Sequence, residues 1–170
     1  MRRRRPALQA LADVVRELVV QGEGEQLEFK AFIATTDATK FQEVIETAIA
    51  FANTQGGTIL IGVNKYGEIE DIQRQQLFYE WCKKNKTAVG DKGVQRHAQT
   101  VKEILAERLA PVPPLDVDIA TCDGASVVLV TVSRGPELPY HDRASNVWVR
   151  RGATNQRATP GRDRHIYPRQ

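Results

Sequence analysis

The sequence predicts a single α/β domain, in which helices flank a mixed sheet, and three observations support that class. Apolar residues recur at helical spacing in residues 7–20, 41–52 and 94–109. Residues 58–63 form a wholly apolar run without alternation, which is typical of a strand covered on both faces. A chain of 170 residues is long enough to bury one core of this kind.

Residues 51–63 organise the expected fold, because the end of a helix, a turn and the central strand follow one another directly. Asn53, Gly56 and Gly57 stand where the helical pattern stops. Asparagine and glycine tolerate a positive φ better than other residues do. We therefore predict that these three residues form the structural turn between the helix and the strand.

Two shorter patterns frame this unit on its N-terminal side. Residues 27–32 alternate between apolar and polar side chains, which predicts a half-buried strand. A polar connection then offers Asp37 or Thr39 as the cap of the helix that reaches residue 52.

The second half is predicted to alternate between helices and strands, with prolines after residue 110 ending a helix. Its expected elements are a tight turn at 64–67 with a short strand at 68–72, helices at 75–86 and 94–109, strands at 115–120 and 125–133, and a last strand at 146–150 followed by a turn at 152–155.

Composition narrows the class of protein. Hydrophobic residues make up 41% and charged residues 26%, as in ordinary globular proteins. No apolar run approaches the length of a membrane span, and the first residues lack the apolar core of a secretory signal. Cys82 and Cys122 are far apart and fit two reduced thiols better than a disulfide. We therefore expect a cytoplasmic protein.

The net charge of +3 conceals basic ends on an acidic middle. Residues 134–170 contain eight arginines against three acids, and arginine is suited to bidentate phosphate contacts. This asymmetry favours nucleic acid, DNA or RNA, as the partner, although exposed ends that are merely solvated give the same pattern. The candidate phosphate-binding residues are Arg134, Arg143, Arg150, Arg151 and Arg157. Alternation along the last strand places Arg150 on the face opposite Val149.

Several short stretches of the sequence, taken in order, resemble the AlbA-2 domain of Schlafen proteins and many bacterial regulators. The similarity spans roughly residues 20–158 and divides the chain into a basic N-terminus with a leading helix (1–21), an AlbA-2-like domain (22–158) and a basic C-terminal tail (159–170). The stretches that carry it are Gly22-Glu23, Leu27-Glu28-Phe29-Lys30, Ala50-Phe51-Ala52-Asn53-Thr54-Gln55-Gly56-Gly57 with the strand up to Val63, Pro139-Tyr140, and Val147-Trp148-Val149-Arg150-Arg151-Gly152-Ala153-Thr154-Asn155.

The resemblance implies an α/β nucleic-acid-binding domain and, in some Schlafen relatives, a metal-dependent endoribonuclease that acts on tRNA-like RNA with three carboxylates. Glu23 and Glu28 match the first two carboxylates and would bind Mg²⁺ or Mn²⁺, with Lys30 assisting catalysis. The third normally follows the Gly-Val of the central strand, where this sequence has Asn64-Lys65. The nearest acids that remain as a third ligand are Glu68, Glu70 and Asp71.

Each of these residues also has a purely structural interpretation. Glu28 is equally consistent with a surface carboxylate screened by Lys30. Tyr140 and Trp148 are candidates for stacking on bases, but such residues more often belong to a core. A third class of function is an assembly module that pairs with itself or with another chain through the apolar stripe Leu8, Leu11, Val15 and Leu18.

Other chemistries lack their motifs. The glycine pair precedes a strand and is not part of a GxxxxGK[ST] loop, so ATP binding is not expected. The histidines and cysteines do not have zinc-ligand spacing, and no serine lies in a nucleophile-elbow context.

Overall fold

The structure is a computed structural model that describes residues 4–167, with side chains described from residue 10 onward. The rest of the two basic ends, residues 1–3 and 168–170, lies outside the described residues. The elements in chain order are α1 (Arg4–Gln21), β1 (Leu27–Lys30), α2 (Ala38–Asn53), β2 (Gly57–Ile61), a 3₁₀ turn (Ile72–Arg74), α3 (Gln76–Lys84), α4 (Asp91–Arg108), β3 (Leu115–Cys122), β4 (Ala125–Val132), β5 (Trp148–Arg151) and β6 (Thr154–Arg157).

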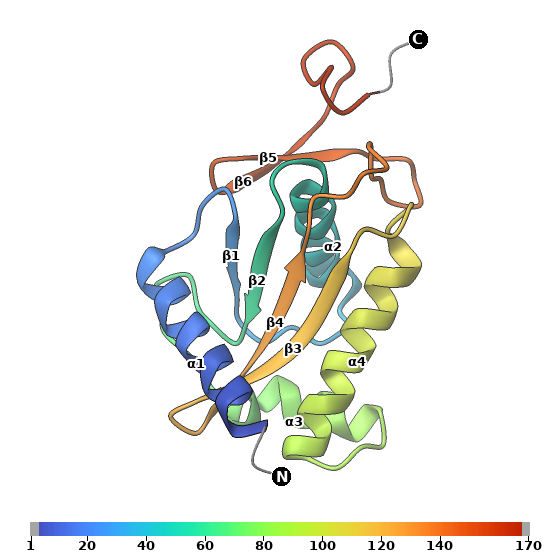
Figure 1. The fold of residues 1–170 in the computed structure, drawn as a ribbon. Coiled ribbons are helices and arrows are strands. Elements are labelled where there is room, and N and C mark those ends of the chain that lie inside the picture. The colour runs from blue at the N-terminus through green and yellow to red at the C-terminus, as the bar shows by residue number, and fades with distance from the viewer. Residues whose placement is uncertain (1–3, 168–170) are drawn as a thin grey trace.

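A four-stranded mixed sheet forms the centre of the molecule, in the order β1-β2-β4-β3 (Figure 1). Strands β1 and β2 are parallel, whereas β4 is antiparallel to both β2 and β3. Helix α1 packs on one face of the sheet, and the core on the other face is built with α2, α3 and α4. The predicted mixed α/β class is therefore confirmed.

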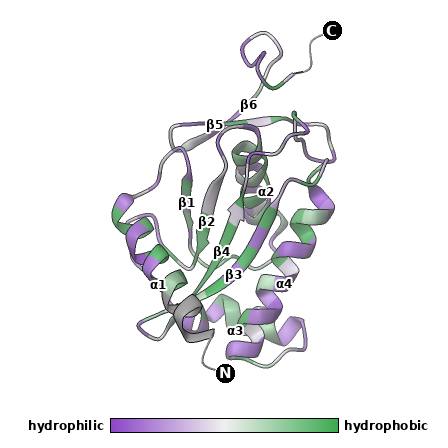
Figure 2. Cartoon of the chain, in the orientation of Figure 1, coloured by the Kyte–Doolittle hydropathy of each residue, from purple (hydrophilic) through white to green (hydrophobic). Residues whose placement is uncertain are grey.

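Strand β2 is covered on both faces, as its unbroken apolar pattern predicts. Ile59 and Ile61 belong to the larger core on the α2 face, while Leu60 belongs to the cluster under α1, and all three are fully buried. Strand β4 is hydrophobic along most of its length, whereas α1, α3 and α4 mix hydrophobic and polar residues (Figure 2). Cys82 and Cys122 are free and buried, one in each cluster.

The turn from α2 into β2 requires its two glycines. Gly56 has a φ of +74°, and its amide donates to the Phe51 carbonyl at 2.7 Å. A Cβ on Gly56 would lie 2.7 Å from the Val132 carbonyl oxygen, and a Cβ on Gly57 would lie 2.8 Å from the Phe51 ring. Any side chain here would therefore displace either the antiparallel neighbour β4 or the end of α2.

Two local predictions are corrected. Residues 68–72 form only an isolated bridge between Val63 and Ile69 before the 3₁₀ turn, because the Asn64 side chain accepts the amides of Tyr66 and Glu68 and closes a compact loop. Residues 154–157, predicted in part as a turn, instead form β6, which pairs with β5 around Gly152 at a φ of +58°.

The β5–β6 hairpin lies across one end of the sheet, beside the C-terminal end of α2 (Figure 1). This is the end where β1 and β2 begin and β4 finishes, since Gly57 is paired with Val132. The side chains of Arg134, Arg143, Arg151 and Arg157 belong to the loops and strands of this end, which we call the hairpin end.

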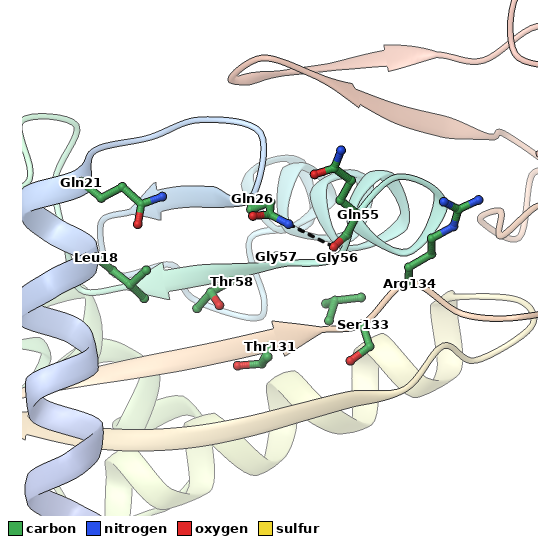
Figure 3. Close-up of a pocket in the computed structure, with 11 residues that line it drawn as sticks. Leu18, Gln21, Gln26, Gln55, Gly56, Gly57, Thr58, Thr131, Ser133 and Arg134 are labelled. Atoms are coloured by element: carbon green, nitrogen blue, oxygen red, sulfur yellow. Dashed lines mark hydrogen bonds between the residues drawn. The ribbon is translucent and has the colours of Figure 1, made fainter.

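Helix α1 covers only part of its face of the sheet. Val15 is fully buried, and Leu11 and Leu18 pack half-buried against the same cluster, so these members of the apolar stripe face the domain itself. The Leu8 side chain lies outside the described ones. Beyond Leu18 a groove opens between α1 and the hairpin end (Figure 3). Among residues 4–167, no helix is long and apolar enough to cross a membrane.

Candidate nucleic-acid interface

Asn53 fastens the hairpin end to the core. The residue is fully buried, and its side-chain amide donates to the Tyr140 carbonyl at 2.8 Å and to the Trp148 carbonyl at 2.9 Å. Its side-chain oxygen accepts the Tyr140 amide at 2.7 Å. The asparagine predicted as a turn residue therefore connects the end of α2 to two segments that are distant in the sequence.

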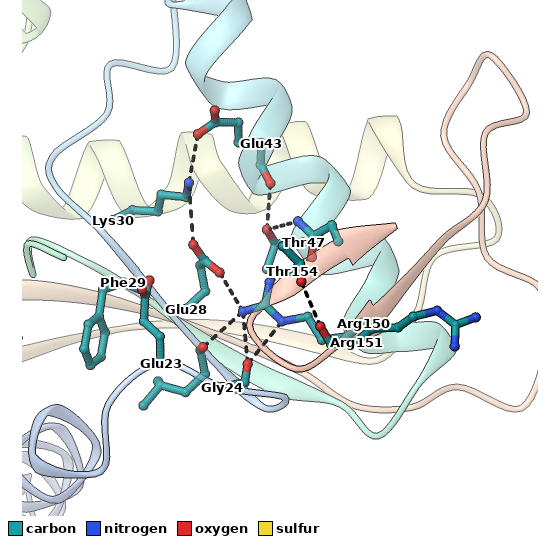
Figure 4. Close-up of polar contacts among 12 residues, drawn as sticks. Glu23, Gly24, Glu28, Phe29, Lys30, Glu43, Thr47, Arg150, Arg151 and Thr154 are labelled. Carbon is teal, nitrogen blue, oxygen red and sulfur yellow. Dashed lines mark hydrogen bonds and ion pairs between the residues drawn. The ribbon is translucent and has the colours of Figure 1, made fainter. Parts of the chain in front are cut away.

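Arg150 makes the second attachment of the hairpin end to the core. It was predicted to contact phosphate, but the structure places its guanidinium inside the protein. Its side chain is 1% exposed, and Nη2 lies 2.7 Å from the Glu28 carboxylate (Figure 4). The guanidinium also donates to the carbonyls of Gly24 and Leu27 and to the Asn155 side chain, and it lies 5.1 Å from the centre of the Phe51 ring. Arg150 does project away from Val149, but onto β1 rather than into solvent.

Glu28 and Lys30 continue this network toward α2. Lys30 Nζ lies 2.8 Å from the Glu43 carboxylate and 3.6 Å from that of Glu28. Burial raises the pKa of the Glu28 carboxyl, while the hydrogen bond from Arg150 acts in the opposite direction. The carboxylate predicted as a metal ligand is therefore held between two cations.

Glu23 is exposed, and its carboxylate caps the start of β1 by accepting the Phe29 amide at 2.9 Å. The remaining acids of the expected triad are occupied elsewhere: Glu70 accepts from the Asn64 amide at 2.9 Å, and Asp71 accepts the amides of Gln73 and Ser126. Glu68 also lies by Asn64, at 3.4 Å.

This donor set does not fit a divalent cation of the expected kind. Within residues 4–167, no three histidine, cysteine, aspartate or glutamate side chains are grouped so that they could hold a metal ion. Mg²⁺ and Mn²⁺ prefer carboxylate oxygens that are not already paired with cations. Glu28 is paired with Arg150 and Lys30, and within the described part of the chain no third acid joins it and Glu23. We therefore derive no metal-dependent step from these residues.

The other predicted arginines reach solvent. Arg134 follows β4 and is exposed, as is Arg157 on β6, whose guanidinium lies 5.4 Å from the centre of the Trp148 ring. Arg143 is exposed and donates to the Glu107 carbonyl at 2.9 Å. The Arg151 side chain is 39% exposed and pairs with the buried Asp163.

The two aromatic candidates differ in position. Tyr140 is fully buried, and its hydroxyl accepts the Glu137 amide, so its ring is part of the core. Trp148 is half-buried between that core and Arg157. Tyr140 therefore has no free face for a base, and Trp148 is covered on one side by Arg157.

Sequence reasoning missed two features of this end. Arg162 is exposed and donates to the Arg157 carbonyl at 2.8 Å, which folds the segment after β6 back onto the hairpin. The groove beside α1 was also missed, because its lining comes from three separate parts of the chain. An arginine-rich C-terminal segment is the only sequence signal that pointed toward Arg162.

These features define a class of protein: a mixed α/β domain whose sheet is closed at one end by a hairpin and carries exposed arginines there. The model of the family described as Schlafen, AlbA_2 matches residues 23–159. The chain belongs to this family, and the resemblance inferred from its motifs is confirmed.

Two solved structures share the fold. The DIP2311 protein from Corynebacterium diphtheriae is 16% identical with a TM-score of 0.60; the match covers 96% of this chain but 28% of that one. The N-terminal domain of a RecG-related protein from Nitrosomonas europaea is 21% identical with a TM-score of 0.52, covering 87% of this chain and 92% of that one. No curated protein matches the sequence.

Proposed function

We propose that this domain binds nucleic acid through the hairpin end. The observation that carries the proposal is the unequal placement of charge there. Arg134 and Arg157 are exposed, whereas two acids of the same end, Asp142 and Asp163, are 7% and 1% exposed; Glu137 is the exposed acid nearest Arg134 in the sequence. Arginines that face solvent beside acids that face inward present a positive surface to a phosphate backbone.

The buried acids are neutralised or hydrogen-bonded locally. Asp142 accepts the amides of Ala144 and Asn146, and Asp163 accepts the Thr159 amide and pairs with Arg151 and Arg162. Arg151 and Arg162 keep exposed surface despite that pairing. The acids therefore fix the shape of the surface, and the arginines supply its outward charge.

Membership in the Schlafen AlbA_2 family and the similar fold of a domain from a RecG-related protein support a role in nucleic-acid association. Phosphate contacts account for most non-specific affinity and make it fall steeply with salt. Arg150 takes no direct part in this proposal, because its guanidinium is buried against Glu28.

The test is a salt series of binding isotherms. Fluorescence anisotropy is measured with labelled tRNA, single-stranded RNA, single-stranded DNA and duplex DNA. For the double variant Arg134→Gln/Arg157→Gln we expect weaker binding to every ligand and a logarithmic salt slope smaller by about 2, because each phosphate contact contributes about 0.9.

The matched control is Lys83→Gln/Lys84→Gln, which removes two exposed charges from α3. This control should bind like the wild type. Absence of binding to any nucleic acid at low salt, or an equal loss in both double variants, would contradict the proposal. Parallel mixtures with Mn²⁺ or EDTA check that bound RNA stays intact.

A further inference from the structure

The groove beside α1 is a distinct feature of the hairpin end (Figure 3). It has a volume of about 370 Å³ and lies where α1 finishes, β2 begins and β4 ends. Its lining residues are Leu18, Gln21, Gln26, Gln55, Gly56, Gly57, Thr58, Thr131, Val132, Ser133 and Arg134.

The lining is polar but almost uncharged. Three glutamines and three hydroxyl-bearing residues are among the lining residues, and Arg134 is the single charged residue of that lining. The Gln26 side chain donates to the backbone carbonyl of Gln55 at 3.3 Å. The side-chain amide of the exposed Gln55 points away from Gln26 (Figure 3). Such a set offers both donors and acceptors to a neutral ligand and one cation to an anion at its edge.

The floor of the groove combines glycine backbone with threonine side chains. Gly56 and Gly57 are among its lining residues, and a Cβ on Gly56 would meet the β4 backbone while a Cβ on Gly57 would meet the Phe51 ring. Thr58 and Thr131 are directly paired across β2 and β4, so both side chains lie on the α1 face. The sheet therefore fixes the floor of the groove, and longer side chains from Gln21, Gln26 and Arg134 line its rim.

We propose that this groove holds an unpaired base of a single-stranded nucleic acid, with Arg134 binding the adjoining phosphate. This inference rests on the proposed nucleic-acid function. A volume of about 370 Å³ falls in the range of small-ligand sites. Amide and hydroxyl groups match the mixed donor and acceptor edges of bases, and the Watson–Crick edges are accessible in a splayed single strand but paired within a duplex.

The negative charge on β3 determines on which side the bound nucleic acid leaves the groove. Asp116 is paired with Thr131 and Asp118 with Leu129, and both aspartates are exposed on the α1 face. A phosphate passing over β3 would meet these two carboxylates. The backbone of the ligand therefore leaves the groove past Arg134, toward Arg157 and the hairpin.

The test compares a labelled single-stranded oligonucleotide, the same strand with its bases replaced by abasic sites, and the corresponding duplex. Thr58→Val and Thr131→Val each remove a hydroxyl from the groove lining without removing charge. We expect the double variant to bind the single strand roughly tenfold more weakly, with an unchanged salt slope and unchanged duplex binding. The abasic strand should not distinguish this variant from the wild type.

Thr121→Val is the matched control, because Thr121 is an exposed β3 residue outside the groove. It should bind like the wild type, and thermal unfolding of each single variant checks that the fold is kept. If the groove variants bind the single strand normally while salt-sensitive binding persists, the groove proposal fails and the proposed function stands. If no nucleic acid binds at low salt, both fail.

Discussion

Arg150 and Arg157 lie on adjacent strands of one hairpin, yet they occupy opposite environments. The Arg150 side chain is 1% exposed, pairs with Glu28 and donates to the carbonyls of Gly24 and Leu27. Arg157 is exposed, its guanidinium lies 5.4 Å from the centre of the Trp148 ring, and its backbone carbonyl accepts from the Arg162 side chain. Arg150 therefore holds the hairpin in place, whereas the Arg157 side chain faces solvent.

The comparison teaches that an arginine-rich segment has two separable roles. A buried guanidinium donates its hydrogen bonds to groups inside the protein. Removing it leaves those groups unpaired and lowers the free energy of unfolding. A solvated guanidinium contributes little to stability and remains available to phosphate. The following predictions test this division, from the largest expected effect to the smallest.

Arg150→Met should be strongly destabilising. The change leaves the half-buried Glu28 carboxylate without its main partner, and we expect a loss of about 3–5 kcal/mol in the free energy of unfolding. Denaturant unfolding measures the loss, with Arg157→Met as the exposed control expected to change little. Glu28→Gln combined with Arg150→Met should recover part of the stability. If Arg150→Met unfolds at the same denaturant concentration as the wild type, Arg150 does not have the structural role assigned to it.

Asn53→Ala should cost about 3 kcal/mol, since it removes three buried hydrogen bonds at once and leaves backbone groups at Tyr140 and Trp148 unpaired. Asn85→Ala, which removes one hydrogen bond to the Trp81 carbonyl, is the control and should cost about 1 kcal/mol. Equal losses in the two variants would show that Asn53 does not join α2 to the hairpin end.

His97 predicts a pH dependence away from the hairpin. It is fully buried beside Phe32 and Trp81, its Nε2 lies 3.0 Å from the Ile33 carbonyl oxygen, and burial lowers its pKa to about 4. As the pH falls, the imidazole of His97 takes up a proton in the unfolded chain before it does so in the folded chain. The free energy of unfolding therefore decreases by up to about 3 kcal/mol between pH 6.5 and pH 4.

Unfolding curves at several pH values between 7 and 4 measure this loss, and His97→Gln should flatten it. The raised pKa of Glu28 acts with the opposite sign, because the folded state then binds its proton more readily than the unfolded state does. Equal pH dependence in the wild type and His97→Gln would assign the effect to other groups.

Glu137→Gln should give the smallest effect. Glu137 is an exposed acid on the loop after β4, near Arg134 in the sequence, and its charge opposes phosphate binding. We expect affinity for nucleic acid to rise about twofold at low salt and the difference to vanish at high salt. Glu80→Gln on α3 is the control, and the same anisotropy assay compares the two variants.

The predictable part of the fold came from local patterns. Helical spacing indicated α1, α2 and α4, and the unbroken apolar run of residues 58–63 indicated a strand covered on both faces. The β6 strand was missed because four polar residues carry no periodic apolar signal and are ordered by pairing with β5. Residues 68–72 were overestimated because the side-chain bonds of Asn64 form a loop instead.

For the candidate site, the sequence indicated the basic segment and the residues of the family motif. Neither could separate Arg150 from its neighbours, since its four partners include Glu28, which lies 122 positions earlier in the chain. The pairing of Glu28 with Arg150 likewise depends on where the hairpin docks, whereas Lys30 lies on the same strand as Glu28. The family resemblance therefore suggested a metal site at Glu23 and Glu28, whereas in the folded chain Glu28 forms ion pairs and Glu23 accepts a backbone amide.

The sequence by itself determined the fold class, the glycine turn at Gly56 and Gly57, and the family, because each depends on neighbouring residues and their order. Tertiary structure decided which arginine is buried, where Asn53 donates and how the groove is lined. Those outcomes depend on segments distant in the chain meeting at one end of the sheet, where burial changes the cost of each charge and unpaired polar group.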